Sequence, residues 1–493
     1  MLGSAVLVEE RGAGQRLIGH VTWAGEAAGD ATLRTFLLER LPTYMIPSRF
    51  VSHDSFPMTT SGKIDRNELS RLDQAPADLD RAAIDVANGL EEFLVGLWNS
   101  VLGRSDISVD DQVFDLGATS LDAADFVNEV QRALDEFVYV VTVFTSPTVG
   151  QYAEFLRINY PEAVAERFGE STTSESMKRA RHANDQSEDR VGVHRVDDAV
   201  IAELVDLVIP SAPYPGWTES RPGPPAVFIL APPRSGTTLL RVMLAGHSQL
   251  FAGPELQLLN FDTMEQRAER LSGRFAPWRE GLLRAVMELE NVDAETAGGF
   301  VDREAVTHPS CKAFFHLLQD RADRVVIDKS PAYAMELDVL RNAETGFDEP
   351  RYIHLVRHPS AMVESFTRYH MEQILYLRDH SMPSRVLAEA VWTLSHRNIE
   401  TFATEVGERC LRVHFEDLVV DPAATMAMVA EFLHVPFEET MVQPYQDVSN
   451  KMVDGLHAAS TPMGDTRFLE RGRIDPAAAG RWPRDTIPED LGE

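Results

Sequence analysis

The feature that most constrains the fold is an apolar segment that runs through a tight turn into a helix. Residues 226–231 read AVFILA, the turn that follows reads PPRSG, and a helical pattern begins at about Thr237. A strand that passes directly into a helix points backbone N–H groups and the positive end of the helix dipole at one place, which favours an anion there. We therefore predict an α/β domain with a parallel sheet and a phosphate cradle after its first strand. The cradle consists of Arg234, Ser235, Gly236, Thr237 and Thr238.

This turn lacks the spacing of a nucleoside triphosphate loop. The Walker A pattern, G-x-x-x-x-G-K-[ST], needs two glycines and a lysine, whereas this turn has Gly236 alone and places Arg234 before it. An ATP-dependent kinase is therefore disfavoured. A P-loop kinase-like phosphotransferase is kept as the alternative with the same fold.

Charge and cysteine content exclude several classes of protein. The chain has 493 residues, and its 46 basic and 77 acidic residues give a net charge of −31, which disfavours binding to nucleic acid. Only Cys311 and Cys410 occur, so we expect neither a disulfide framework nor a metal site, and we expect a reducing, cytoplasmic location. The sequence has no signal-peptide pattern and no run of about 18 apolar residues, so we expect no association with a membrane.

Changes in composition divide the chain into modules. Residues 169–190 contain only one sizeable apolar side chain, Met177, so burial cannot offset the entropy cost of ordering this segment. A weaker break, rich in Ala and Pro, lies near residues 73–83. We expect a small α+β subdomain at 1–75, a helical domain at 83–160, a flexible linker at 161–195 and the α/β domain at 196–493.

The first module combines strands with one helix. Alternating apolar residues predict strands at 5–9, 16–23 and 49–53, and a helical pattern covers 31–40.

A stretch near the end of this module carries a family resemblance. Residues 41–69, LPTYMIPSRFV…FPMTTSGKIDRNEL, resemble the C-terminal subdomain of adenylate-forming enzymes, the activating modules of nonribosomal peptide synthetases. The resemblance implies that Lys63 reaches into an adenylation site, the alternative being a solvated turn lysine. Because the large ATP-binding portion does not precede it, we expect adenylation to need upstream modules or a separate adenylating enzyme.

The second module is predicted to be a helical bundle with an acidic surface. Residues 91–102 place their apolar side chains on one helix face, and further helices are predicted at 120–136 and 147–157, the last with Pro147 at its first position. Thirteen acidic and three basic residues over 85–157 give a charge of about −10, which favours basic partner surfaces.

The centre of this bundle resembles acyl and peptidyl carrier proteins. Residues 110–127 read DDQVFDLGATSLDAADFV, and the family signature is matched at Asp111, Phe114, Leu116, Gly117, Ser120 and Leu121. The resemblance implies a four-helix carrier whose Ser120 receives 4′-phosphopantetheine from a phosphopantetheinyl transferase. The alternative for Ser120 is an ordinary helix N-cap.

The third module resembles sulfotransferases that use 3′-phosphoadenosine-5′-phosphosulfate (PAPS). The P-R-S-G-T-T turn is similar to their 5′-phosphosulfate loop. In 352–366 a buried strand is followed by Arg357 and then Ser365, which matches the family's 3′-phosphate site, where a guanidinium and a hydroxyl share one phosphate. Residues 411–433 carry the strand, E-D-L, D-P and helix pattern that closes the family's core.

The same resemblance implies the catalytic groups. Glu255 looks like the family's base carboxylate, the alternative being a surface carboxylate, and His308 and His316 are reserve candidates for the base. Lys329, which follows an apolar strand, resembles the lysine that stabilises the bridging oxygen together with Arg234. The alternative for Lys329 is a structural ion pair with Asp328.

Together these resemblances lead to one expected function. We expect transfer of a sulfuryl group from PAPS to a hydroxyl of an acyl or aminoacyl chain held on Ser120, in polyketide or nonribosomal peptide biosynthesis. In polyketide synthases a related carrier and sulfotransferase act on a β-hydroxyacyl chain that later loses sulfate and CO₂ to leave an alkene. The alternative of a different class is a non-catalytic carrier scaffold that binds a partner.

Overall fold

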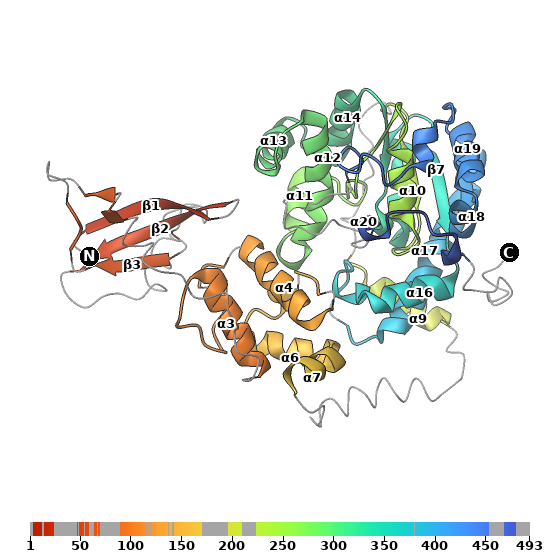
Figure 1. The fold of residues 1–493 in the computed structure, drawn as a ribbon. Helices are drawn as coiled ribbons and strands as arrows, with labels where there is room; N and C mark the ends of the chain where they lie inside the picture. Colours follow the sequence, from red (N-terminus) through yellow and green to blue (C-terminus); the bar gives the residue numbers. More distant parts are fainter. Residues whose placement is uncertain are drawn as a thin grey trace. The chain divides into compact units, whose positions relative to one another are not determined.

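The computed structural model divides the chain into two compact units, Met1–Asp189 and Arg190–Glu493 (Figure 1). It describes residues 3–11, 14–23, 47, 49–53, 55–58, 64–66, 68–69, 89–169 without 115, 119, 137 and 141, 196–209, 223–452 without 379, and 468–479.

The first unit begins with a three-stranded sheet in the order β1-β2-β3. Strand β1 (Gly3–Arg11) pairs antiparallel with β2 (Gly14–Thr22), which pairs parallel with β3 (Arg49–His53). The strands therefore lie where alternating apolar residues predicted them. The helix expected at 31–40 and the side chain of Lys63 fall outside the described residues.

The described residues of 89–169 form helices that pack around one apolar core. The helices are α3 (Leu90–Leu102), α4 (Ser120–Leu134), α5 (Thr142–Thr145), α6 (Val149–Asn159) and α7 (Pro161–Phe168). At the centre of the core, the ring of Phe126 stacks on Trp98 at 4.2 Å and meets Tyr152 edge-on at 5.2 Å. The expected helical carrier fold is confirmed.

Helix α6 begins later than expected. The sequence placed Pro147 at the first helical position, but the N-cap is Thr148. Its Oγ1 accepts a hydrogen bond from the backbone N–H of Gln151 at 3.1 Å, and Gln151 Oε1 accepts one from the N–H of Thr148 at 3.3 Å. This reciprocal capping box satisfies two end groups of the helix and leaves Pro147 outside it.

Helix α7 corrects the boundary of the expected linker. Residues 161–168 were assigned to that linker, but Pro161 begins a helix whose Val164 is buried and whose Phe168 ring lies 5.2 Å from that of Phe93. The helix has so few apolar residues that its periodicity is weak in the sequence, and contact with the bundle is what stabilises it. The linker prediction is therefore wrong for this segment, and 170–195 lie outside the described residues.

The second unit is built on a five-stranded parallel sheet, as predicted. Its strands are β4 (Val227–Leu230), β5 (Leu250–Ala252), β6 (Val325–Asp328), β7 (Arg351–Val356) and β8 (Cys410–His414), in the order β5-β6-β4-β7-β8. After β4 the chain continues to β5, which lies on one side of β4 in the sheet. After β7 it continues to β8, which lies on the other side of β4. The carboxyl ends of β4 and β7 thus mark the switch point, where open α/β sheets form their binding crevice.

Helices cover both faces of this sheet and enclose two apolar cores (Figure 1). Phe228 of β4 faces one core and Ile229 the other. The longer helices are α9 (Asp198–Leu207), α10 (Thr237–Leu244), α11 (Met264–Arg270), α12 (Glu280–Glu290), α13 (Ala294–Thr307), α14 (Cys311–Ala322), α15 (Leu337–Gly346), α16 (Pro359–Arg368), α17 (Ser384–Val406), α18 (Phe415–Val420) and α19 (Pro422–Phe432). In the part of the chain that is described, no helix is both long and apolar enough to cross a membrane.

Two histidines are buried against each other between β7 and α17. His354 Nε2 lies 2.8 Å from His396 Nδ1. Burial is the main cause that lowers the pKa of His396 to about 3, and burial also holds the pKa of His354 well below its usual range. Both rings are therefore neutral in the folded protein at neutral pH.

This pair should make the second unit less stable in acid. The unfolded chain takes up a proton on His396 near the ordinary pKa of 6.5, whereas the folded chain does so only near 3, so stability falls as the pH drops through this interval. Between about pH 7.5 and pH 5, His396 should contribute a loss of about 2 kcal/mol. We expect urea unfolding of His396→Gln to show a shallower pH dependence than the parent protein, and parallel profiles would contradict the assignment.

Candidate active site

The predicted cradle lies in the turn between β4 and α10. Arg234 and Gly236 have φ angles of 64° and 87°, both in the left-handed region that favours glycine. A Cβ at Gly236 would lie 2.2 Å from the Phe415 ring, so both conformation and space require glycine there. Ser235 is fully buried, and its Oγ has no hydrogen-bond partner among the described residues. An unsatisfied buried hydroxyl beside an anion-binding turn suits a bound phosphate oxygen.

The second predicted phosphate site is joined to the cradle. Arg234 Nε donates a hydrogen bond to Ser365 Oγ at 3.1 Å, and a terminal nitrogen of Arg357 donates to the carbonyl of Arg234 at 2.6 Å. Each guanidinium also lies over an aromatic ring, Arg234 over Tyr369 at 4.4 Å and Arg357 over Phe415 at 4.7 Å. The structure thus brings together Arg234, Arg357 and Ser365, three of the polar residues that the sequence selected for phosphate binding.

The two aromatic rings were missed by sequence reasoning. Phe415 directly precedes the E-D-L motif, so its position beside that motif was an available signal, but its contact with the cradle depends on the pairing of β7 with β8. Tyr369 follows α16 and had no comparable signal in the sequence.

Glu255 and Lys329 form a buried ion pair. Lys329 Nζ lies 2.5 Å from Glu255 Oε1, and the two side chains are only 3% and 8% exposed. Glu255 is therefore not a surface carboxylate, and Lys329 forms its salt bridge with Glu255 and not with Asp328. The second carboxylate oxygen, Oε2, is buried and has no hydrogen-bond partner in the described part of the chain. That oxygen can accept a proton or a hydrogen bond from a bound hydroxyl.

The sheet explains why these residues meet. The cradle follows β4, Glu255 lies shortly after β5, Lys329 directly follows β6 and Arg357 directly follows β7. These four strands are neighbours in one parallel sheet, so their carboxyl ends share an edge. The groups predicted to bind phosphate and the buried Glu255–Lys329 pair therefore lie at the same edge.

Asp328, the last residue of β6, is buried beside this pair. It accepts hydrogen bonds from Ser330 Oγ at 2.9 Å, Tyr333 Oη at 2.5 Å and the N–H of Leu256 at 3.2 Å. Burial is the largest cause that raises the pKa of Asp328 to about 6, and the three hydrogen bonds oppose it. Asp328 therefore accepts hydrogen bonds from its neighbours, while Lys329 pairs with Glu255.

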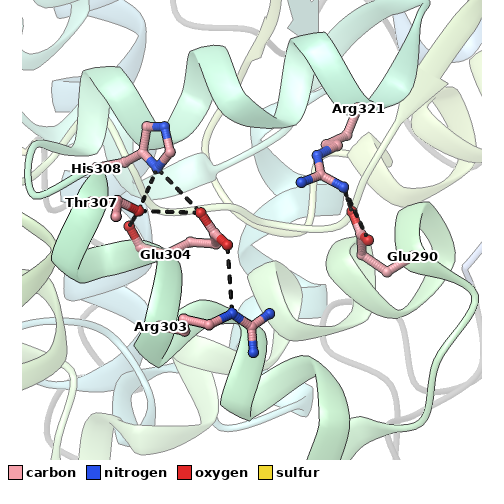
Figure 2. A network of polar contacts seen from close by, with 6 residues as sticks. All are labelled: Glu290, Arg303, Glu304, Thr307, His308 and Arg321. Carbon is pink, nitrogen blue, oxygen red and sulfur yellow. Dashed lines mark hydrogen bonds and ion pairs between the residues drawn. The ribbon is translucent and has the colours of Figure 1, made fainter.

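The two reserve histidines are engaged elsewhere. His308 lies at the end of α13, where its Nδ1 is 3.1 Å from Thr307 Oγ1 and 3.4 Å from Glu304 Oε2 (Figure 2). His316, on α14, has its Nε2 3.2 Å from the carbonyl of Gly346. In the described residues no cluster of His, Cys, Asp and Glu could hold a metal ion.

Ser120, the predicted attachment residue, is the first residue of α4. It follows Gly117, whose φ of 98° makes the turn that leads into this helix. A helix N-terminus suits a phosphodiester on this residue because unpaired N–H groups and the helix dipole favour an anion there.

Comparisons with known proteins agree with both domains. Residues 225–439 match the sequence family described as the sulfotransferase family, and residues 92–156 match the phosphopantetheine attachment site. Over 157 residues the chain is 35% identical to bacitracin synthase 3 of Bacillus licheniformis. The matched region makes up 31% of this chain but only 2% of that synthase. The chain thus spans a small part of the nonribosomal peptide synthetases that it matches.

Two solved sulfotransferase domains match slightly more than half of this chain. The sulfotransferase domain from the curacin biosynthetic pathway is 39% identical, with 55% of this chain and 94% of that chain covered and a TM-score of 0.49. The sulfotransferase domain from the Synechococcus PCC 7002 olefin synthase is 40% identical, with 56% and 93% covered and a TM-score of 0.48. The match of residues 225–439 to the sulfotransferase family favours a sulfotransferase over a kinase or a non-catalytic scaffold. The chain belongs to the sulfotransferase family and carries a phosphopantetheine carrier domain on the same polypeptide.

Proposed function

We propose that the enzyme transfers a sulfuryl group from PAPS to a hydroxyl of an acyl or aminoacyl chain held by phosphopantetheine on Ser120. The observation that carries this proposal is the buried Glu255–Lys329 pair, which lies at the same sheet edge as the cradle and as Arg357. Proton removal and stabilisation of negative charge are the two requirements of this reaction, and one edge of the sheet supplies groups for both.

The donor's two phosphate groups have separate places on the protein. The cradle would hold the 5′-phosphosulfate through its backbone N–H groups and the unpaired Ser235 Oγ. Arg357 and Ser365 would share the 3′-phosphate, which ATP does not have. The link between Arg357 and the carbonyl of Arg234 couples the two sites, so occupation of one should order the other.

The acceptor hydroxyl would lose its proton to Glu255. Lys329 engages Oε1 and orients the carboxylate, while Oε2 stays available to the hydroxyl. As the acceptor oxygen bonds to sulfur, the bond between sulfur and the bridging oxygen breaks, and Lys329 and Arg234 stabilise the charge left on that oxygen. The departing nucleotide is the 3′,5′-bisphosphate.

The carrier domain would deliver the acceptor. A chain tethered to Ser120 meets the active site at a high effective concentration, so the second unit does not need strong affinity for the free acid. The curacin and olefin synthase sulfotransferase domains support a place in such an assembly line. Upstream modules or a separate adenylating enzyme would load the carrier, after a phosphopantetheinyl transferase has modified it.

Substitution of the attachment residue tests the carrier role. Ser120→Ala should abolish the mass increase that coenzyme A and a phosphopantetheinyl transferase produce, because only a hydroxyl can form the phosphodiester. Intact-mass spectrometry provides the readout. Ser100→Ala on α3 is the matched control and should gain the full mass. A full gain in Ser120→Ala would disprove attachment at this residue.

The second phosphate site can be tested by binding of 3′-phosphoadenosine-5′-phosphate. Arg357→Ala should weaken its affinity by about 1.5 to 3 kcal/mol, the range for hydrogen bonds with charged groups. Isothermal titration calorimetry measures the change. Arg397→Ala, which removes an exposed arginine paired with Asp198, should leave affinity unchanged. Equal affinities for the two variants would remove the 3′-phosphate site from the proposal.

The base is tested by a change that keeps the volume of the side chain. Glu255→Gln cannot take up the proton, so turnover of the tethered substrate should fall by about 10² to 10⁴ while donor affinity stays the same. Glu405→Gln, at an exposed carboxylate paired with Arg341, controls for general effects of the substitution. Turnover of Glu255→Gln within a few-fold of the parent protein would show that Glu255 is not the base.

A further inference from the structure

The segment that carries Glu255 is irregular and yet deeply buried. Leu256, Leu258 and Leu259 are fully buried, and Gln257 is 3% exposed. Residues 255–259 belong to no helix or strand, so their backbone groups have no regular ladder of hydrogen bonds. Buried backbone N–H and C=O groups must nevertheless be paired, because an unpaired one costs about as much as a lost hydrogen bond. Here side chains elsewhere in the fold are the acceptors for the N–H groups of residues 256–259.

The end of β6 supplies the first two partners. Asp328 Oδ1 accepts a hydrogen bond from the N–H of Leu256, and Ser330 Oγ accepts one from the N–H of Gln257, both at 3.2 Å. Lys329, the partner of Glu255, lies between these two residues in the chain. Residues 328–330 therefore position both members of the ion pair. Lys329 is one of these residues, and Glu255 directly precedes the two residues whose N–H groups bind Asp328 and Ser330.

Tyr333, on the short helix η4 (Pro331–Met335), is the acceptor for the next two backbone N–H groups. Its hydroxyl oxygen accepts hydrogen bonds from the N–H groups of Leu258 at 2.9 Å and Leu259 at 3.2 Å. The same hydroxyl donates to Asp328 Oδ2 at 2.5 Å, and the hydroxyl of Ser330 donates to Oδ1 at 2.9 Å. Asp328 thus accepts a hydrogen bond from each of the two hydroxyl groups. The oxygen atoms of both hydroxyls remain available as acceptors for backbone N–H groups.

Other groups hold the opposite side of the segment. Arg267 is buried and donates to the carbonyls of Leu256 at 2.9 Å and Gln257 at 3.1 Å. Gln257 has a φ of 52°, a left-handed conformation that is unfavourable for its side chain and persists where the surroundings impose it. A Cβ at Gly281 would lie 2.0 Å from the carbonyl oxygen of Glu255, so α12 also fits closely against the segment.

We propose that Asp328, Ser330 and Tyr333 act as a positioning triad that fixes the backbone of residues 255–259 and thereby aims the Glu255 carboxylate. This inference rests on the proposed role of Glu255 as the base. The triad does not touch the substrate; it acts through Glu255.

These side chains satisfy buried backbone N–H groups, which by itself stabilises the fold. The position of these N–H groups directly after Glu255 gives the side chains a further role. The Asp328 carboxylate and two hydroxyl groups accept hydrogen bonds from four consecutive N–H groups, those of residues 256–259. These residues directly follow Glu255, whose carboxylate needs an exact orientation. Misplacement of a catalytic group by about 1 Å costs on the order of 100-fold in rate, so this precision has a functional value.

Hydrogen exchange tests the positioning without any activity assay. In the full chain, the amides of Leu258 and Leu259 should exchange about 10-fold faster or more in Tyr333→Phe, because their acceptor is lost. Ser330→Ala is the milder second variant, in which hydrogen exchange of the Gln257 amide should become faster because its acceptor is lost. The control is Tyr352→Phe, which removes the hydroxyl of another buried tyrosine of the same apolar core, bonded to Glu344 at 2.6 Å. Unchanged exchange over 256–259 in both triad variants would overturn the inference.

Kinetics then test whether the triad acts through Glu255. Tyr333→Phe should lower kcat by about 10- to 100-fold with the KM for PAPS unchanged, whereas Tyr352→Phe should leave kcat within about twofold. In a Glu255→Gln background, Tyr333→Phe should cause little further loss, because the group that it positions is already inactive. A full additional loss in that background, or a kcat of Tyr333→Phe equal to that of Tyr352→Phe, would overturn the inference.

The two experiments separate this inference from the proposed function. If Glu255→Gln alone keeps its turnover, the proposed base is wrong, whatever the exchange data show. If Glu255→Gln loses turnover but the triad variants change neither exchange nor kcat, the base stands and the positioning triad is wrong.

Discussion

Parallel pairing of β4 with β6 and with β7 is the constraint on which the rest of the second unit depends. Because parallel strands end at one edge, segments that are far apart in the chain arrive there together, and the reversal between β4 and β7 marks the switch point at which sheets of this kind bind ligands. The cradle, the Glu255–Lys329 pair and Arg357 all follow strands of this sheet. The topology of the sheet therefore creates the site, and side-chain contacts such as that between Arg357 and the carbonyl of Arg234 refine it.

The same edge contains charges that water hardly reaches. Removal of an ion from water costs several kcal/mol, and a buried pair seldom recovers this as stability. Glu255 and Lys329 nevertheless pair in the interior, and Asp328 lies fully buried next to them in a net of hydrogen bonds. Such groups contribute more to chemistry at fixed positions than to the stability of the fold, which is the physical basis for the function and the positioning triad that we propose.

The carrier domain follows a simpler rule, since short helices cover one apolar core around Trp98 and Phe126. Its sequence pattern predicted the main helices well because each of them buries one face. The two errors, at Pro147 and at residues 161–168, have a common physical origin. The start of α6 depends on a reciprocal capping contact, and α7 depends on contact with the bundle, and neither is expressed in hydrophobic periodicity.

Local sequence patterns were enough to predict the parallel α/β class, the position of Ser120 at a helix start, the cradle turn, and the spacing of Arg357 and Ser365, because each depends on residues close together in the chain. The sequence also selected Glu255 and Lys329, but only one at a time. Tertiary structure alone decided that these two side chains pair, that Oε2 of Glu255 is left without a partner, and that Tyr333 binds the segment after Glu255. The physical reason is that such contacts join separate strands, and their geometry exists only once the sheet has formed.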